Sequence, residues 1–117
     1  MKKENPRLRE LICKLKKASI EQNVKLWRRI ARDLEKPTRN FRVVNLSRIN
    51  KYTKENEVVV VPGKVLGSGK LEHKLTISAF NFSNSAIEKI NKVGAKIVPL
   101  EKLIKENPKG KAIKIIG

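Results

Sequence analysis

A run of four consecutive valines, at positions 58–61, most constrains what this 117-residue chain can fold into. Successive side chains of a β-strand point to opposite faces of a sheet, so an uninterrupted apolar strand is expected to be buried on both faces. Such strands occur in α/β folds. The length of the chain allows one domain with a modest core.

Two helices are predicted in the N-terminal third, where apolar residues recur at helical spacing. Asn5 and Pro6 mark the start of the first helix, which is expected to fade near residues 18–19. Asn23 is expected to cap the second helix, and Pro37 ends it. Trp27 and other apolar residues of the second helix form one face, which is expected to be buried.

The chain after the second helix alternates between strand and helix patterns, following a basic loop over residues 36–42. Tyr52 is expected to face inward at the end of a short helix, and Phe80 to belong to the core. Ser85 and Glu88 match a capping box, and Gly94 stops the helix that this box begins. The expected elements are a short helix over 45–52, strands over 57–61 and 74–80, a helix over 85–93, a strand over 95–98, a helix over 100–106 and a strand over 112–116. The predicted fold class is α/β, with a basic helical N-terminal arm over residues 1–42 and a core domain over residues 43–117.

The balance of charge points to a polyanionic partner. Lys and Arg number 28 against 11 Asp and Glu, which gives a formal net charge of +17 and a pI of about 10.4. Self-repulsion at this charge opposes compaction, and nucleic acid is the commonest polyanion that offsets it. No segment is long and apolar enough to span a bilayer, no signal-peptide pattern is present, and the basic residues are spread along the whole chain.

Metal and redox chemistry have little to build on in this sequence. Cys13 is the only cysteine and His73 the only histidine, so neither an intramolecular disulfide nor a zinc-finger spacing exists. A reduced, intracellular setting is expected. Cys13 lies beside the apolar face of the first predicted helix and is interpreted as a small filler.

A row of cations without an acid lies on the second predicted helix. Asp33 and Glu35 fall off this row, so like charges repel along it and a partner is expected to offset that cost. All eight arginines lie at or before Arg48, which places the most demanding phosphate contacts in the N-terminal third. The row, at spacing i, i+3, i+4 and i+7, is Lys25, Arg28, Arg29 and Arg32.

The glycine-rich segment over residues 62–71 follows the valine run and suits close contact with phosphate. It fails the Walker A pattern, because Gly63 and Gly69 enclose five residues and Lys70 is followed by Leu71 rather than by a hydroxyl. The glycine spacing also fails the Rossmann fingerprint. No enzyme is therefore predicted, although a nucleotide-binding enzyme using this loop, and a plain glycine turn between strands, remain as alternatives.

Recognition of nucleic acid is expected to act through shape and backbone. Aromatic residues make up only 4% of the chain, so serial base stacking is not expected. No zinc finger, basic zipper or aromatic strand motif is present. Folded RNA fits this profile best, and an architectural DNA-binding protein is the alternative.

Several motifs along the chain carry a resemblance to a known family. They are residues 5–8, Trp27, and residues 34–37, 44–50, 59–69, 79–83 and 115–117. With them the chain resembles the large-subunit ribosomal protein family "L eighteen-e" of archaea and eukaryotes, which is related to the bacterial large-subunit protein "L fifteen". The compact length resembles that of archaeal members.

The resemblance implies an irregular β-β-α superhelical core, a non-catalytic role and burial against large-subunit rRNA. The expected partners are that rRNA and neighbouring ribosomal proteins in the cytoplasm, with one folding unit on the ribosome. No cofactor, metal, small-molecule substrate, membrane or homo-oligomer is expected. The expected RNA-binding residues are Arg7, Arg9, Lys25, Arg28, Arg29, Arg32, Lys36, Arg39, Arg42, Arg48, Lys64, Gly67, Ser68, Gly69, Lys70 and Lys74.

Overall fold

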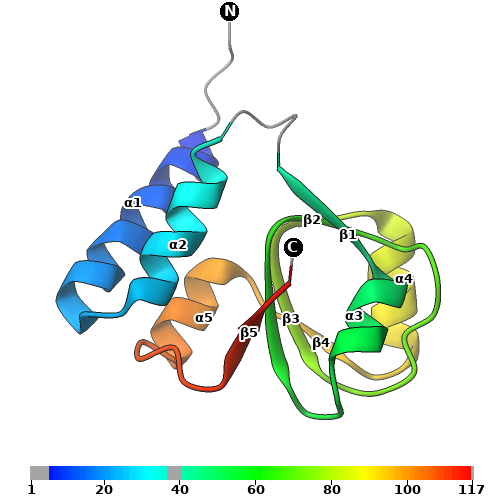
Figure 1. Cartoon of the computed structure of the whole chain (residues 1–117). Helices are drawn as coiled ribbons and strands as arrows, with labels where there is room; N and C mark the ends of the chain where they lie inside the picture. The colour runs from blue at the N-terminus through cyan, green and yellow to red at the C-terminus, as the bar shows by residue number, and fades with distance from the viewer. Residues whose placement is uncertain (1–5, 37–40, 117) are drawn as a thin grey trace, which may run out of the picture.

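A computed structural model describes residues 6–36 and 41–116 of the chain (Figure 1). It confirms a mixed α/β fold that begins with a helical segment. The elements in chain order are α1 (Pro6–Gln22), α2 (Lys25–Leu34), β1 (Arg42–Asn45), α3 (Leu46–Tyr52), β2 (Val58–Leu66), β3 (Thr76–Phe82), α4 (Asn84–Lys92), β4 (Lys96–Ile97), α5 (Leu100–Glu106) and β5 (Ile113–Ile115).

The sheet has five strands, and every pair in it is parallel. The long strand β2 is its centre. Strand β3 pairs with one edge of β2, while β5 and β1 share the other edge, β5 beside residues 58–60 and β1 beside residues 63–66. The register of β2 against β3 shifts between Val61 and Lys64, which marks a bulge.

The valine run is buried on both faces of this sheet, as predicted. Val59 and Val61 belong to an apolar cluster with α3 and α4. Val58 and Val60 contact a second cluster, which contains residues of α1, α2 and α5. The alternation of side chains along one strand therefore produces three layers, with helices on both faces of a parallel sheet.

Helices α1 and α2 form a pair that packs on the second face of the sheet (Figure 1). Trp27 anchors the pair: its side chain is 0% exposed, and its Nε1 donates to the carbonyl oxygen of Pro108 at 2.8 Å. Phe80 of β3 is buried in the same cluster. Both aromatic residues thus lie in the core, as predicted.

The boundary between α1 and α2 differs from the prediction. Helix α1 does not fade near residues 18–19 but continues to Gln22. Asn23 does not cap α2; it has a φ of 56° and ends α1, a conformation that asparagine tolerates better than most residues. Val24 occupies the N-cap position without a side-chain hydrogen bond. Asn5, the expected cap of α1, lies outside the described residues.

Strand β1 was not predicted. The sequence indicated a loop up to residue 42 and then a helix from residue 45, whereas Arg42–Asn45 pairs with β2 and α3 begins at Leu46. Four residues are too few for a periodic signal, so pairing with a distant segment decides their structure. The inward orientation predicted for Tyr52 is also wrong, since its side chain is 51% exposed.

Two further local predictions are corrected. The N-cap of α4 is Ser83 and not Ser85: the Ser83 Oγ accepts from the amide of Ala86 at 3.2 Å. Cys13 is exposed on α1 rather than a filler of the core. The stop at Gly94 is confirmed, because this residue follows α4 with a φ of 78°.

Candidate nucleic-acid interface

The cation row on α2 is exposed over its whole length. The opposite side of the helix is buried against the core, so the row points away from the sheet. Among the described residues, none of the four cations lies in an ion pair with a carboxylate. The charge of the row is therefore not offset by a carboxylate within the described part of the chain. Its members are Lys25, Arg28, Arg29 and Arg32.

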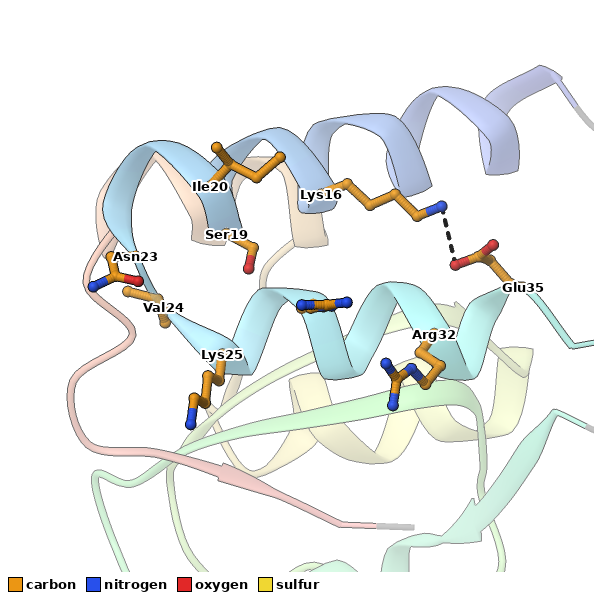
Figure 2. A pocket seen from close by; sticks show the side chains of 9 residues that line it. Lys16, Ser19, Ile20, Asn23, Val24, Lys25, Arg32 and Glu35 are labelled. Atoms are coloured by element: carbon orange, nitrogen blue, oxygen red, sulfur yellow. Dashed lines mark ion pairs between the residues drawn. The ribbon is translucent and has the colours of Figure 1, made fainter.

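A groove between α1 and α2 runs along this row (Figure 2). Lys16 from α1 extends across it toward Glu35, with 3.2 Å between Nζ and Oε1. Ile20, also from α1, is 82% exposed on its rim. Lys25, Arg28 and Arg32 line the α2 side. The groove thus combines cations with apolar surface between two packed helices.

Two of the predicted RNA-binding residues are paired inside the protein. Asp33 lies 3.5 Å from the Lys36 ammonium and 3.7 Å from the Arg42 guanidinium, and its side chain is mostly buried. These pairs connect the end of α2 to the start of β1. Part of the charge of Lys36 and Arg42 is therefore offset within the chain.

Two predicted arginines contact aromatic rings. Arg7 donates to the carbonyl oxygen of Phe80 at 3.3 Å, and its guanidinium carbon lies 5.0 Å from the centre of that ring. The guanidinium carbon of Arg48, on α3, lies 5.5 Å from the centre of the Tyr52 ring. Arg9 is exposed on α1. Arg39 lies outside the described residues.

The first half of the glycine-rich segment is strand and not loop. Residues 62–66 continue β2, and Gly63 is buried opposite Arg42 of β1. A Cβ on Gly63 would lie 2.0 Å from the carbonyl oxygen of Arg42, so only glycine allows β1 to approach β2 here. Lys64 alternates with the buried Val65 and is exposed. This glycine therefore allows β1 to pack against β2, and only residues 67–70 remain as the predicted phosphate loop.

Residues 67–70 form a tight loop between α3 and α4. A Cβ on Gly67 would lie 2.3 Å from Ser85 Oγ and 2.7 Å from the amide nitrogen of Ala86. Gly69 has a φ of +87°, and its Cβ would lie 2.4 Å from that of Ser47. Both glycines are required where the backbone passes between the two helices. Ser68 and Lys70 are exposed on the outer side of the loop.

The predicted residues form two regions rather than one surface. The α2 row belongs to the layer of α1, α2 and α5, whereas residues 67–70 pack on α3 and α4 in the other layer. Figure 1 shows the α1–α2 pair and the α3–α4 pair on opposite sides of the sheet. Lys74 lies apart from the tight loop, with its side chain beside Gly94 at the end of α4.

Sequence reasoning missed two residues that shape the loop. The Lys89 ammonium donates to the carbonyl oxygens of Gly67 and Gly69, and the Ser47 amide donates to that of Ser68. Each contact joins residues about twenty positions apart. No periodicity or local motif reports such contacts.

The Glu57 carboxyl, whose pKa is lowered, lies outside both regions. The amide of Lys54 and then the ammonium of Lys114 donate to the Glu57 carboxylate and lower its pKa. Lys114 also donates to the carbonyl oxygen of Tyr52 at 3.0 Å. These contacts connect the end of α3, the start of β2 and β5.

The described residues contain no group of three or more His, Cys, Asp and Glu side chains that could hold a metal ion. Over the same part of the chain, no helix has the length and apolar character needed to cross a membrane.

Comparison with known proteins identifies the family of the chain. Residues 24–98 match a family model of ribosomal proteins that covers 50S-L15, 50S-L18e and a 60S counterpart. The chain belongs to this family of ribosomal proteins.

Archaeal relatives cover nearly the whole chain. A large ribosomal subunit protein eL18 of Methanoregula boonei is 48% identical over 99% of this chain and 96% of its own length. The protein of the same name from Methanothermobacter thermautotrophicus is 47% identical over 97% of this chain and 94% of its own. A third, from Methanospirillum hungatei, is 46% identical with the same coverage. These matches confirm the family resemblance and its archaeal character.

Proposed function

We propose that this protein is a structural, non-catalytic constituent of the large ribosomal subunit that binds and tethers folded rRNA. The observation that carries this function is the pair of phosphate-suited regions on opposite faces of one sheet. A protein with such regions on two faces holds two RNA segments at a set separation. The archaeal relatives are named as proteins of the large ribosomal subunit, which supports the same role.

The α2 row supplies contacts along an RNA backbone. Arginine makes bidentate contacts with phosphate, and three of the four cations in the row are arginine. The nearby carboxylates of Asp33 and Glu35 form ion pairs with cations outside the row. The charge of the row is therefore available to the RNA. Lys64 and Lys70 extend the proposed contacts to β2 and to the loop over residues 67–70. Neighbouring ribosomal proteins and a place in the cytoplasm belong to the same proposal.

Charge reversal on α2 tests this function. The pair Arg28→Glu and Arg32→Glu is expected to lower affinity for folded large-subunit rRNA by about tenfold or more, because two phosphate contacts are lost. The salt dependence of binding should decrease for the same reason. Binding of the full chain would be measured over a series of salt concentrations. The matched control is Lys105→Glu with Lys109→Glu, which makes the same charge change at exposed positions on and after α5.

Three results would contradict the proposal. Equal losses in both double variants would mean that net charge alone drives binding. A collapse of thermal stability in proportion to lost affinity would make the α2 row structural. Affinity of the wild-type chain that does not change between low and moderate salt would contradict the electrostatic account.

A nucleotide-binding enzyme is the rival from another class. A phosphate-binding P-loop leads directly from a strand into a helix, whereas residues 67–75 lead from β2 into β3. We therefore expect no saturable binding of ATP or GTP with Mg²⁺ by the purified chain. Co-sedimentation with large subunits, compared with capture on chromosomal DNA, separates the rRNA function from that of an architectural DNA-binding protein.

A further inference from the structure

The loop after β2 is held by a lysine that points at the loop's own backbone. Lys89, on α4, donates through Nζ to the carbonyl oxygen of Gly67 at 2.5 Å and to that of Gly69 at 2.9 Å. Between these two, the amide of Ser47 donates to the carbonyl oxygen of Ser68 at 3.1 Å. Three consecutive carbonyls are thus bound from the side of the protein.

Binding the carbonyls sets the direction of the amides. In a trans peptide unit the C=O and N–H bonds point in opposite directions, and every described peptide bond is trans. The carbonyls of residues 67–69 share their peptide units with the amides of Ser68, Gly69 and Lys70. These three amides are therefore turned away from Lys89 and Ser47, toward the exposed side of the loop.

The three amides have no acceptor within the part of the chain that the structure describes. Backbone amides are obligatory donors, so they bind water or a ligand. Successive amides that line one side of a glycine-containing turn make an anion-binding concavity. A phosphate oxygen is an acceptor of matching charge and size.

We propose, on the basis of the rRNA-binding function above, that Lys89 is a positioning residue that turns the amides of residues 68–70 toward an RNA phosphate. Its ammonium binds the carbonyl side of the loop instead of the phosphate. A cation on these carbonyls also polarises the peptide units, which makes their amides stronger donors. Lys70, on the exposed side, supplies the charge that meets the phosphate directly.

Inorganic phosphate is a probe for this cradle that does not require rRNA. In the ¹⁵N-labelled full chain, titration with phosphate is expected to shift the amide resonances of Ser68, Gly69 and Lys70. Lys89→Met should abolish these shifts, because it keeps the aliphatic stem and removes the donors. Lys89→Arg should restore them, because a guanidinium can donate to two carbonyls. Lys92→Met, on the exposed end of the same helix, is the matched control and should leave them unchanged.

Affinity for folded rRNA separates a positioning residue from a direct contact. Lys89→Met is expected to lower affinity about tenfold, with the salt slope of the Lys92→Met control. Lys70→Met should instead lower the slope by about one, as expected for a lost phosphate contact.

Several outcomes would overturn the role of Lys89. In one, Lys89→Met lowers the salt slope by about one and keeps the phosphate-induced shifts, which would make Lys89 a phosphate ligand. In another, Lys89→Met behaves like Lys92→Met in both measurements. If Lys89→Met does not fold, the test rests on Lys89→Arg. A folded Lys89→Arg variant without the phosphate-induced shifts would also contradict the positioning role of Lys89. Wild-type protein that fails to bind rRNA would contradict the proposed function, while the phosphate titration would still test the cradle.

Discussion

The α2 row and the loop over residues 67–70 are suited to the same kind of partner, but they differ in which atoms face it. Beyond the first turn of α2 the amides are hydrogen-bonded within the helix, so side chains such as Arg28 are the groups that can reach a phosphate there. In the loop the carbonyls are bound by Lys89 and Ser47, and the amides of residues 68–70 have no acceptor within the described part of the chain. One region presents charge on side chains, and the other presents backbone donors.

This difference shows that a lysine in a basic protein need not face the nucleic acid. Lys89 and Lys70 lie close to the same loop and have the same chemistry, yet the Lys89 ammonium is directed at carbonyl oxygens. Asp33 similarly binds Lys36 and Arg42 within the protein. The number of cations in the sequence therefore overstates the number that are free for a partner.

The largest expected effect tests whether both regions belong to one folding unit. Trp27→Ala should destabilise the protein by about 3–5 kcal/mol, because it removes a fully buried aromatic side chain and leaves the Pro108 carbonyl without its donor. We expect one unfolding transition, observed equally by helix-sensitive and sheet-sensitive probes in a denaturant series. The comparison variant is Lys25→Ala, an exposed change on the same helix, which should alter stability by less than about 0.5 kcal/mol. Two separate transitions would instead divide the chain into an arm over residues 1–42 and a core over residues 43–117.

A smaller effect distinguishes side-chain contacts from backbone contacts. Arg28→Gln should lower affinity for rRNA and reduce the salt slope by about one, because a charged phosphate contact is lost. Gly69→Ala should lower affinity with an unchanged slope, because a Cβ clashes with Ser47 at a φ of +87° and distorts the amides without removing charge. Binding isotherms over a series of salt concentrations measure both, with thermal unfolding of Gly69→Ala as the control for folding. Equal changes of slope would remove the distinction between the two regions.

The smallest effect concerns Glu57, at the start of β2 and outside both regions. The Lys54 amide and the Lys114 ammonium lower the pKa of this carboxyl in the folded protein. A lowered pKa contributes stability above the ordinary glutamate pKa of about 4.3, and that contribution is lost as the pH falls through the folded-state pKa. Glu57→Gln should therefore lose less stability than the wild type between neutral pH and about pH 3, when urea unfolding is compared across pH. Its binding to rRNA at neutral pH should be unchanged; a changed affinity would extend the interface to this end of the sheet.

Strong periodic or local signals were sufficient for much of the fold. The valine run predicted a strand buried on both faces, and apolar spacing predicted both N-terminal helices with Trp27 in the core. A local signal failed at the start of α4, where Ser83 and not the predicted Ser85 is the N-cap. Strand β1 was missed, because it is short and becomes a strand only by pairing with β2 about twenty residues away.

For the candidate site, too, the sequence predicted features that depend on neighbouring residues and missed those that depend on distant segments. The cation row on α2 was predictable, since its residues are neighbours on one helix. The placement of Gly63 in a loop was wrong, because the strand extends through this glycine and β1 packs against it.

The sequence by itself determined the class of partner, the amphipathic character of α2 and the family, because charge, periodicity and motifs are properties of residues close together in the chain. Only the tertiary structure decided which cations remain available and which way the loop amides face. Those outcomes depend on contacts between distant segments, such as Lys89 with Gly67 and Asp33 with Arg42. A hydrogen bond between distant residues exists only once packing has brought its partners within reach.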